Sequence, residues 1–173
     1  MLYLNIIFAI IISLYLYWLW GLLRAFRSDA PYVPMSRAVL ERMMALVEPR
    51  AGDIWVDLGS GDGRVLIEAA KRFSVRGIGI ERISALRTLA RFKIILTGLR
   101  GSVRIKRGDF FTENISDANI VSFYLLPHTG ARLMEKLRRE LQPGSLVVFH
   151  RYPIQGIPLI KEDPECKIYV ARL

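Results

Sequence analysis

An acidic residue ends or follows each of three strand-like segments in the middle of the chain, and a glycine-rich turn follows the first of them. Asp57 ends DIWVD and opens DLGSGDGR, Glu81 ends RGIGIE, and Asp109 stands in GDFF. A glycine turn between a strand and a helix lets the backbone approach a ligand and directs N–H donors toward it. A carboxylate at the end of the next strand can accept hydrogen bonds from a ribose diol. These residues predict a binding site for a nucleoside.

The charges around the turn indicate which nucleoside it takes. The stretch lacks the Gly-Lys-Ser/Thr of a nucleoside-triphosphate P-loop, and Asp57 and Asp62 would repel a pyrophosphate. S-adenosylmethionine has a cationic amino acid end, a ribose diol and an adenine amine, and it carries no phosphate. The sequence therefore favours S-adenosylmethionine over NAD as the cofactor. A degenerate fold that binds neither is the other alternative, and Gly63 and Asp62 also have ordinary interpretations as a helix-packing glycine and a helix N-cap.

Strand-like and helix-like segments alternate along most of the chain. Strands are predicted at 53–57, 76–81, 102–106, 120–126 and 145–150, helices at 36–47, 64–73, 84–96 and 129–141, and a final apolar run at 167–173. This alternation predicts an α/β, Rossmann-like fold with a mostly parallel, twisted sheet and helices on both faces. Because parallel strands bring their carboxyl ends to one edge, we expect Asp57, Glu81 and Asp109 to converge there.

The first 23 residues are expected to form a transmembrane anchor. Residues 2–23 contain no charge, and a helix of that length spans roughly 33 Å against about 30 Å of hydrocarbon. Arg24 and Arg27 follow at once, so the positive-inside rule predicts a single-pass membrane protein with its folded domain in the cytoplasm. A cleaved signal peptide is disfavoured because no basic region precedes the apolar run. The predicted organisation is an anchor at 1–23, a linker at 24–35 and a folded domain at 36–173.

The net charge of +9 is unevenly distributed along the sequence. The segment 71–107 carries eleven Lys or Arg residues and one acid, Glu81. A solvated helix face, a surface for anionic lipid headgroups and a nucleic-acid surface are the three interpretations. Nucleic acid is disfavoured because few aromatic residues are interleaved there for base stacking. The single cysteine, Cys166, excludes an internal disulfide, and no Cys/His cluster indicates a metal site.

Four stretches together make a family resemblance specific. They are the apolar N-terminal segment, APYVPMS at 30–36, DLGSGDGR at 57–64 and YLLP at 124–127. The chain resembles the class I, seven-stranded methyltransferases. More narrowly, it is similar to the membrane-anchored protein-lysine methyltransferases of mitochondria that modify the ATP synthase c-subunit or the adenine nucleotide translocase, and to their archaeal and bacterial relatives. It departs from the class at the C-terminus, where few residues follow the fifth predicted strand, so strands six and seven are expected to be short.

The resemblance implies roles for the glycine turn and the strand ends. Gly59 and Gly61 would line the methionine end of S-adenosylmethionine, Glu81 would bind the ribose, and Asp109 the adenine amine. Neighbours of these residues complete the expected cofactor site: Asp57, Ser60 and Phe110. The implied activity is transfer of a methyl group to a lysine side chain, and the implied site contains no metal.

Methyl transfer from a sulfonium is an in-line displacement, for which the enzyme aligns an activated donor with a nucleophile. A lysine amine has a pKa of about 10.4 in water, so it must first lose a proton, and desolvation favours this loss. The candidate catalytic residues are Tyr124 and Pro127, around the end of the fourth predicted strand, and Tyr32, before the domain. Tyr124 and Tyr32 also have an ordinary packing interpretation. His128 and His150 are further candidate proton acceptors, with a structural alternative.

The leading hypothesis is a methyltransferase acting on a lysine of a membrane or membrane-proximal protein, with the lipid bilayer as a second partner. The alternatives are methylation of a hydrophobic small molecule or lipid, methylation of RNA, and a non-catalytic scaffold. The fourth predicted strand is not followed by an Asn/Asp-Pro-Pro-aromatic segment, which disfavours methylation of adenine or cytosine amines. The intact set of acids and glycines disfavours a scaffold.

Overall fold

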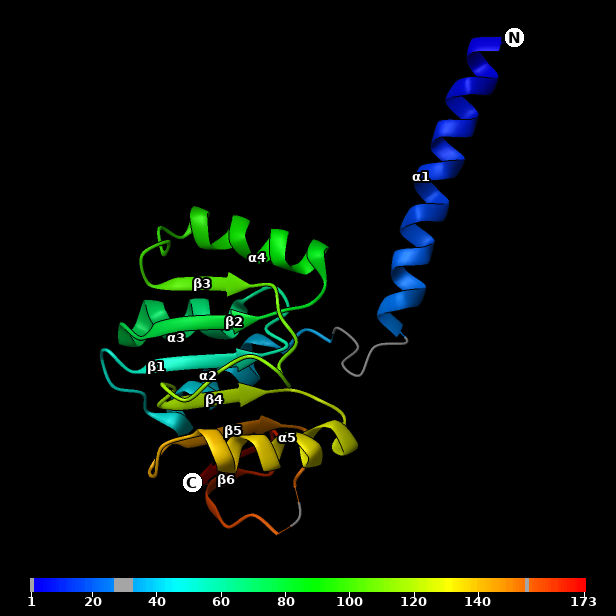
Figure 1. The fold of residues 1–173 in the computed structure, drawn as a ribbon. Coiled ribbons are helices and arrows are strands. Elements are labelled where there is room, and N and C mark those ends of the chain that lie inside the picture. The colour runs from blue at the N-terminus through cyan, green and yellow to red at the C-terminus, as the bar shows by residue number, and fades with distance from the viewer. Residues whose placement is uncertain (1, 27–32, 155) are drawn as a thin grey trace. The chain divides into compact units, whose positions relative to one another are not determined.

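The chain divides into two compact units, Met1–Tyr32 and Val33–Leu173. The computed structural model describes the backbone of residues 2–26, 33–154 and 156–173. The first unit contains helix α1 (Leu2–Phe26), whose described side chains between Tyr3 and Tyr17 are exposed. All other described helices and strands belong to the second unit (Figure 1).

The expected transmembrane anchor is not supported. In the described part of the chain, no helix is both long enough and apolar enough to cross a membrane. The prediction of a single-pass membrane protein with its domain in the cytoplasm is therefore wrong. It rested on the absence of charge in residues 2–23 and on a helix length of roughly 33 Å for that segment.

The second unit is built on one seven-stranded sheet. Its spatial order is β3-β2-β1-β4-β5-β7-β6 (Figure 1). Strands β1 to β5 run parallel, and β7 pairs antiparallel with both β5 and β6. The strands are β1 (Ile54–Leu58), β2 (Arg76–Ile80), β3 (Val103–Lys106), β4 (Ile120–Phe123), β5 (Leu146–His150), β6 (Leu159–Asp163) and β7 (Ile168–Arg172). The expected Rossmann-like, mostly parallel sheet is confirmed.

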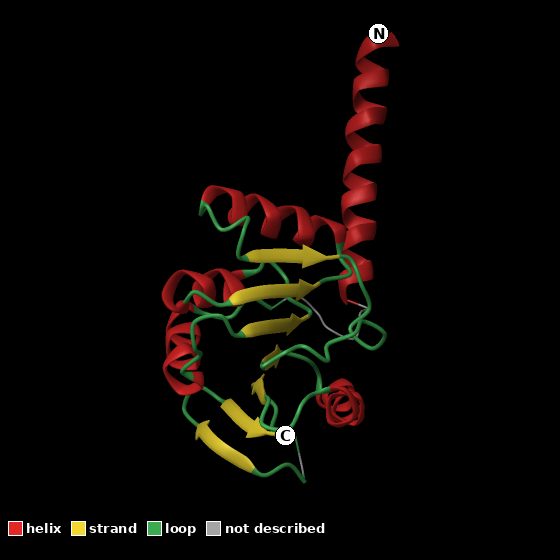
Figure 2. Ribbon diagram, turned by 60° about the vertical axis from the view of Figure 1, so that its left-hand side comes forward, coloured by secondary structure: helices red, strands yellow, loops and turns green. Residues whose placement is uncertain are grey.

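Helices cover both faces of this sheet. Figure 2 shows α2 (Arg37–Val47) and α3 (Arg64–Phe73) on one face and α5 (Pro127–Glu140) on the other, while α4 (Ser84–Leu96) packs beside β3. The core on the α2 and α3 side combines buried residues of helices and strands: Met43, Met44, Trp55, Leu66, Ile120, Val148 and Val170. Because side chains alternate along a strand, the neighbouring positions Val56, Val121 and Phe149 are buried on the opposite face.

Local sequence signals explain where the helices begin. Ser36 caps α2, and its Oγ accepts a hydrogen bond from the N–H of Val39 at 3.3 Å. The bounds of α3 and α4 are those that the sequence predicts. α5 begins at Pro127 instead of residue 129, since proline lacks the N–H that the first helical position leaves unused. β4 correspondingly ends at Phe123 rather than at residue 126.

The C-terminal part is more complete than expected. β6 and β7 have five residues each, as many as β1 and β2. β6 gave no strand signal because nearly all of its side chains are exposed at the sheet edge, which removes the alternation of apolar and polar positions. The last two strands are thus of ordinary length, and it is connections between strands that lack helices in the part of the chain that the structure describes. Within the described residues, neither a helix nor a strand lies between β3 and β4 or between β5 and β6.

Gly79 of β2 makes room for the turn that follows β1. A Cβ at this position would lie 2.5 Å from both Ile105 Cδ1 and Ser60 Oγ. We predict that Gly79→Ala lowers the free energy of unfolding by about 1–3 kcal/mol through overpacking. Gly101→Ala is the control, because no atom lies within 4 Å of its added Cβ. Urea denaturation measures both, and equal stabilities of the two variants would contradict this packing.

Candidate active site

Three glycines shape the turn after β1. Gly59, Gly61 and Gly63 have φ values of +78°, +54° and +76°, a region that residues with a side chain rarely adopt. The N–H groups of Gly59 and Ser60 donate to the carbonyl oxygen of Ile80 at 2.9 and 3.2 Å. These two hydrogen bonds tie the turn to the end of β2, so its backbone lies at the carboxyl edge of the sheet.

Asp57 is buried at the end of β1, with 5% of its surface exposed. Its Oδ1 accepts a hydrogen bond from Ser122 Oγ at 2.6 Å, and that hydroxyl accepts one from Trp55 Nε1 at 2.8 Å. Burial raises the pKa of Asp57 to about 7; the Ser122 hydrogen bond opposes this rise, whereas the negative charges of Glu81 and Asp62 add to it. A cation bound beside Asp57 would therefore favour its ionised form.

Glu81 follows β2 and is also buried. Its Oε2 accepts a hydrogen bond from the N–H of Gly61 at 2.9 Å, and its Oε1 accepts one from the N–H of Ile83 at 2.7 Å. The carboxylate thus joins the glycine turn to the segment that enters α4. A carboxylate has about four acceptor positions, so two remain for a ligand such as a ribose diol.

Asp62 is neutralised by basic side chains. It is 2% exposed and forms ion pairs with Arg64, at 2.8 Å, and with Lys93 of α4. Burial alone would raise its pKa, but the hydrogen bonds and charges of Arg64 and Lys93 hold the pKa well below its usual value. Arg64 Nη1 also donates to the carbonyl oxygen of Met35 at 2.5 Å. Asp62 therefore ties the turn to its surroundings and adds little net negative charge.

The structure also resolves the two ordinary interpretations of this stretch. Gly63, and not Asp62, occupies the N-cap position of α3, and no side chain caps it. A Cβ on Gly63 would lie 3.2 Å from Ala90 Cβ, so this glycine permits the close approach of α3 and α4. Gly63 thus has a packing role, and Asp62 stands one residue before the N-cap position, where its Oδ1 accepts a hydrogen bond from the N–H of Arg64 at 3.4 Å.

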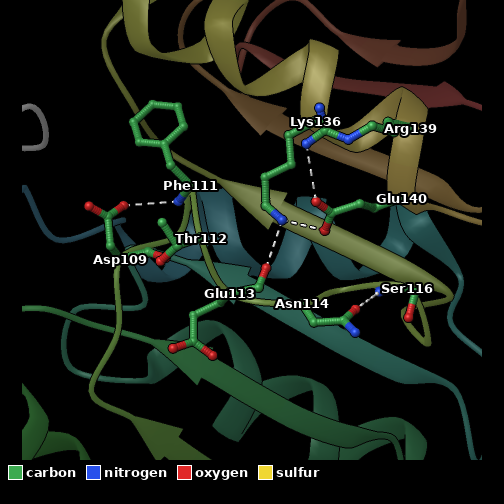
Figure 3. A network of polar contacts seen from close by, with 9 residues as sticks. All are labelled: Asp109, Phe111, Thr112, Glu113, Asn114, Ser116, Lys136, Arg139 and Glu140. Carbon is green, nitrogen blue, oxygen red and sulfur yellow. Dashed lines mark hydrogen bonds and ion pairs between the residues drawn. The ribbon is translucent and has the colours of Figure 1, made fainter.

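Asp109 and Phe110 lie in the loop after β3. The N–H of Glu81 donates to the carbonyl oxygen of Lys106 at 3.1 Å, which places the ends of β2 and β3 side by side. Asp109 is exposed, and its Oδ1 accepts a hydrogen bond from the N–H of Phe111 at 2.9 Å (Figure 3). The structure thus brings three acids to one edge of the sheet, with Asp57 and Glu81 buried and Asp109 on the adjoining loop.

The end of β4 borders the turn from the other side. A Cβ on Gly59 would lie 3.6 Å from Leu125 Cδ2. Tyr124 packs edge-on against His150, with ring centroids 4.5 Å apart, and its hydroxyl accepts a hydrogen bond from Arg151 Nη1 at 3.1 Å. Burial lowers the pKa of His150, and the positive charge of Arg151 acts in the same direction.

The other two candidate catalytic residues are placed less directly. Pro127 is exposed and is the first residue of α5. Tyr32 lies outside the described residues, so its predicted place near the substrate stays a prediction. Of the two histidines, His150 is partly buried behind Tyr124, and His128 is exposed on the first turn of α5.

The described residues fit a cationic nucleoside without phosphate. Ser60 Oγ is buried and has no hydrogen-bond partner among them, so a polar group remains to be satisfied beside the glycine turn. Glu81, and Asp57 in its ionised form, supply negative charge in a setting of low exposure, where it attracts a cation more strongly than in water. Between these two acids, the glycine turn would let a ligand come close to the backbone.

Comparisons with known proteins agree with this geometry. A family model of the ANTKMT methyltransferase domain matches residues 57–161. A protein-lysine N-methyltransferase from Saccharolobus islandicus is 39% identical over 127 residues, covering 73% of this chain and 79% of that protein. The crystal structure of an RNA methyltransferase from Salinibacter ruber in complex with S-adenosyl-L-homocysteine has a TM-score of 0.78 and 34% identity, covering 81% of this chain and 93% of that one.

Two animal enzymes are similar over the same region. The adenine nucleotide translocase lysine N-methyltransferase of Mus musculus is 35% identical over 74% of this chain and 56% of that protein. The ATP synthase C-subunit lysine N-methyltransferase of Homo sapiens is 31% identical over 71% of this chain and 52% of that protein. The matched region thus spans about half the length of these two relatives.

The strand order, the glycine turn and the acids at the carboxyl ends of β1 and β2 define an S-adenosylmethionine-dependent methyltransferase. The chain belongs to the ANTKMT methyltransferase domain family, whose relatives include protein-lysine N-methyltransferases. The predictions of the family, of enzymatic activity and of S-adenosylmethionine as the cofactor are confirmed. The roles assigned to individual site residues stay predictions.

The sequence analysis did not identify the residues that bind the buried acids, namely Ser122 for Asp57 and Lys93 for Asp62. Ser122 is the one hydroxyl in the apolar strand IVSF, and the β1–β4 register sets it beside Asp57. A lone hydroxyl in a buried strand is the signal that could have identified it, because buried polar groups need partners. Lys93 gave no such signal, since it is one of many basic residues on its segment.

We predict that Asp57→Asn changes how stability depends on pH. The pKa of Asp57 is raised from 3.8 to about 7, so its contribution to stability is complete below the lower value and is lost as pH rises through the higher one. The asparagine variant escapes this loss, and between pH 5 and pH 8.5 its free energy of unfolding should rise relative to wild type by about 1–3 kcal/mol. Denaturant titrations measure this, with exposed Asp117→Asn as the control. A pH-independent difference would contradict the buried, protonated carboxyl.

We predict that Glu81→Ala weakens S-adenosylmethionine binding by about 1–3 kcal/mol, because charge-assisted hydrogen bonds are lost. Stability should fall too, since the N–H groups of Gly61 and Ile83 lose their acceptor. Glu68→Ala on α3 is the control, because the ion pair that Glu68 forms with Arg72 lies away from the glycine turn and is partly exposed. Isothermal titration calorimetry measures the affinity, and an unchanged value would remove Glu81 from the site.

Proposed function

We propose that this chain transfers the methyl group of S-adenosylmethionine to the Nζ atom of a lysine in a membrane or membrane-proximal protein. The observation that carries the proposal is the pair of buried carboxylates, Asp57 and Glu81, on either side of the glycine turn. The 39% identity to a protein-lysine N-methyltransferase supports lysine as the acceptor.

The cofactor would lie across the carboxyl ends of β1, β2 and β3. Gly59, Ser60 and Gly61 would hold its methionine end beside Asp57, whose ionised form suits the cationic groups. Glu81 would accept the ribose hydroxyls. For the adenine, Asp109 would accept the exocyclic amine and Phe110 would contact the ring. When bound, S-adenosylmethionine supplies an electrophilic methyl group on a sulfonium.

The acceptor lysine would enter beside the end of β4, where Tyr124 and Pro127 are the candidate contacts. Its nitrogen needs a free lone pair, so the ammonium must lose a proton before the N–C bond forms and the C–S bond breaks. Arg151, which donates to the Tyr124 hydroxyl, brings a positive charge near this position. A like charge lowers the pKa of a neighbouring ammonium, so Arg151 favours the neutral, nucleophilic lysine.

The names of the relatives support the substrate class. Two of them are named for the adenine nucleotide translocase and for the C-subunit of ATP synthase. RNA is the competing acceptor, because the Salinibacter ruber structure is that of an RNA methyltransferase. The basic segment 71–107 is weaker support for RNA binding than its net charge suggests, because some of its basic side chains bind groups of this chain. Arg87 and Arg91 donate to backbone carbonyl oxygens of this chain, and Lys93 pairs with Asp62.

Radiolabelled S-adenosylmethionine tests the proposal on total membranes and on soluble extract of the source cells. We predict label in a protein band that yields methyl-lysine on acid hydrolysis, and clearly weaker label with Glu81→Ala when the cofactor is below saturation. Label that is extracted by organic solvent would indicate a small molecule or lipid, and nuclease-sensitive label would indicate RNA. Either result, without labelled protein, would contradict lysine as the acceptor.

A further inference from the structure

The loop between β3 and β4 holds its shape through its own polar contacts. The carbonyl oxygen of Asp109 accepts hydrogen bonds from the N–H groups of Thr112 and Glu113 at 3.0 and 3.1 Å. The Glu113 side chain lies against Gly108, where an added Cβ would be 2.5 Å from Glu113 Oε1. The place of Asp109, and of Phe110 after it, therefore depends on where Glu113 is held.

Lys136 of α5 holds Glu113 from outside the loop. Its Nζ donates to the carbonyl oxygen of Glu113 at 2.7 Å and forms an ion pair with Glu140 (Figure 3). Arg139 contacts the other carboxylate oxygen of Glu140 at 3.5 Å. The Lys136 side chain is 6% exposed. A buried ammonium is costly without partners, so these contacts strongly restrain both the lysine and the carbonyl that it binds.

A second contact from α5 reaches the same turn. The guanidinium of Arg132 lies over the ring of Phe111, 4.6 Å from its centroid, which is a cation–π geometry. The rings of Phe111 and Phe110 are 4.8 Å apart. α5 therefore contacts the loop at Phe111 and at Glu113, on either side of Thr112. No helix lies between β3 and β4 in the described chain, so this loop is held by the side-chain contacts from α5.

We propose that Lys136 is a positioning residue for the adenine end of the cofactor site. It fixes the Glu113 carbonyl, and through it the turn that directs the Asp109 carboxylate and Phe110 toward the adenine. The inference rests on the proposed role of Asp109. The N–H of Phe111 occupies Asp109 Oδ1, and a carboxylate has a second oxygen for the exocyclic amine. Lys136 should thus act on adenine recognition and not on the transfer of the methyl group.

Lys136→Met tests this, since it removes the ammonium and keeps an unbranched side chain. Two probes are titrated calorimetrically: S-adenosylhomocysteine, and S-inosylhomocysteine, which has an oxygen in place of the adenine amine. Affinity for the adenine compound should fall about five- to tenfold, and affinity for the inosine compound much less. KM for S-adenosylmethionine should rise with kcat unchanged, and Lys136→Arg should recover part of the affinity. Lys161→Met, which breaks a surface ion pair between β6 and Glu48, the residue after α2, is the control.

A double-mutant cycle with Asp109→Ala separates positioning from general stability. If Lys136 acts through Asp109, Lys136→Met will lower the affinity for S-adenosylhomocysteine no further in the Asp109→Ala background. Fully additive losses, or equal losses for the adenine and inosine compounds, would overturn the proposal. An unchanged affinity in Asp109→Ala alone would overturn both this inference and the adenine role of Asp109. Labelling of a protein lysine does not depend on that outcome.

Discussion

The burial of three acidic side chains beside one glycine turn is the constraint on which the rest of the site depends. Asp57, Asp62 and Glu81 are at most 6% exposed. Asp62 is compensated by Arg64 and Lys93, Glu81 by two backbone N–H groups, and Asp57 by a hydroxyl together with a raised pKa. Negative charge therefore remains at Glu81, and a bound cation would add that of Asp57 by favouring its ionised form, so a cationic nucleoside would be stabilised here.

The sheet makes this burial possible by placing small residues around the acids. In the parallel register, Asp57 stands between Gly79 of β2 and Ser122 of β4. Gly79 leaves the space that the Ser60 side chain fills, and Ser122 supplies the hydrogen bond that the Asp57 carboxyl needs. The order of the strands thus determines both the position and the protonation of the central acid, before any ligand is considered.

The sequence was sufficient for features that depend on local pattern. It predicted the parallel sheet, the bounds of α3 and α4, and the glycine turn, because periodicity and glycine spacing are local signals. It did not reveal contacts between distant segments, such as Ser122 with Asp57 or Lys136 with Glu113. β6 was not predicted because the side chains of this exposed edge strand do not alternate between apolar and polar. The predicted membrane anchor was wrong, since no helix of the described residues is long and apolar enough to cross a membrane.

Contacts from α5 restrain the loop between β3 and β4, where the adenine end of the cofactor is proposed to bind. Among the described residues, no helix lies between β3 and β4, and the side chains of Lys136 and Arg132 on α5 contact the connecting loop. Side-chain contacts of this kind depend on a few residues, whereas a packed helix distributes the same restraint over many. The loop after β3 should therefore be the part of the site that is most sensitive to single substitutions.

A crystal structure of the chain with S-adenosylhomocysteine tests the central claim most directly. The claim predicts that the ribose hydroxyls lie within hydrogen-bonding distance of Glu81, that the methionine end crosses the turn at Gly59–Gly61 beside Asp57, and that the adenine lies next to Asp109. A ligand bound away from the carboxyl ends of β1 and β2, or a turn closed by its own side chains, would contradict it.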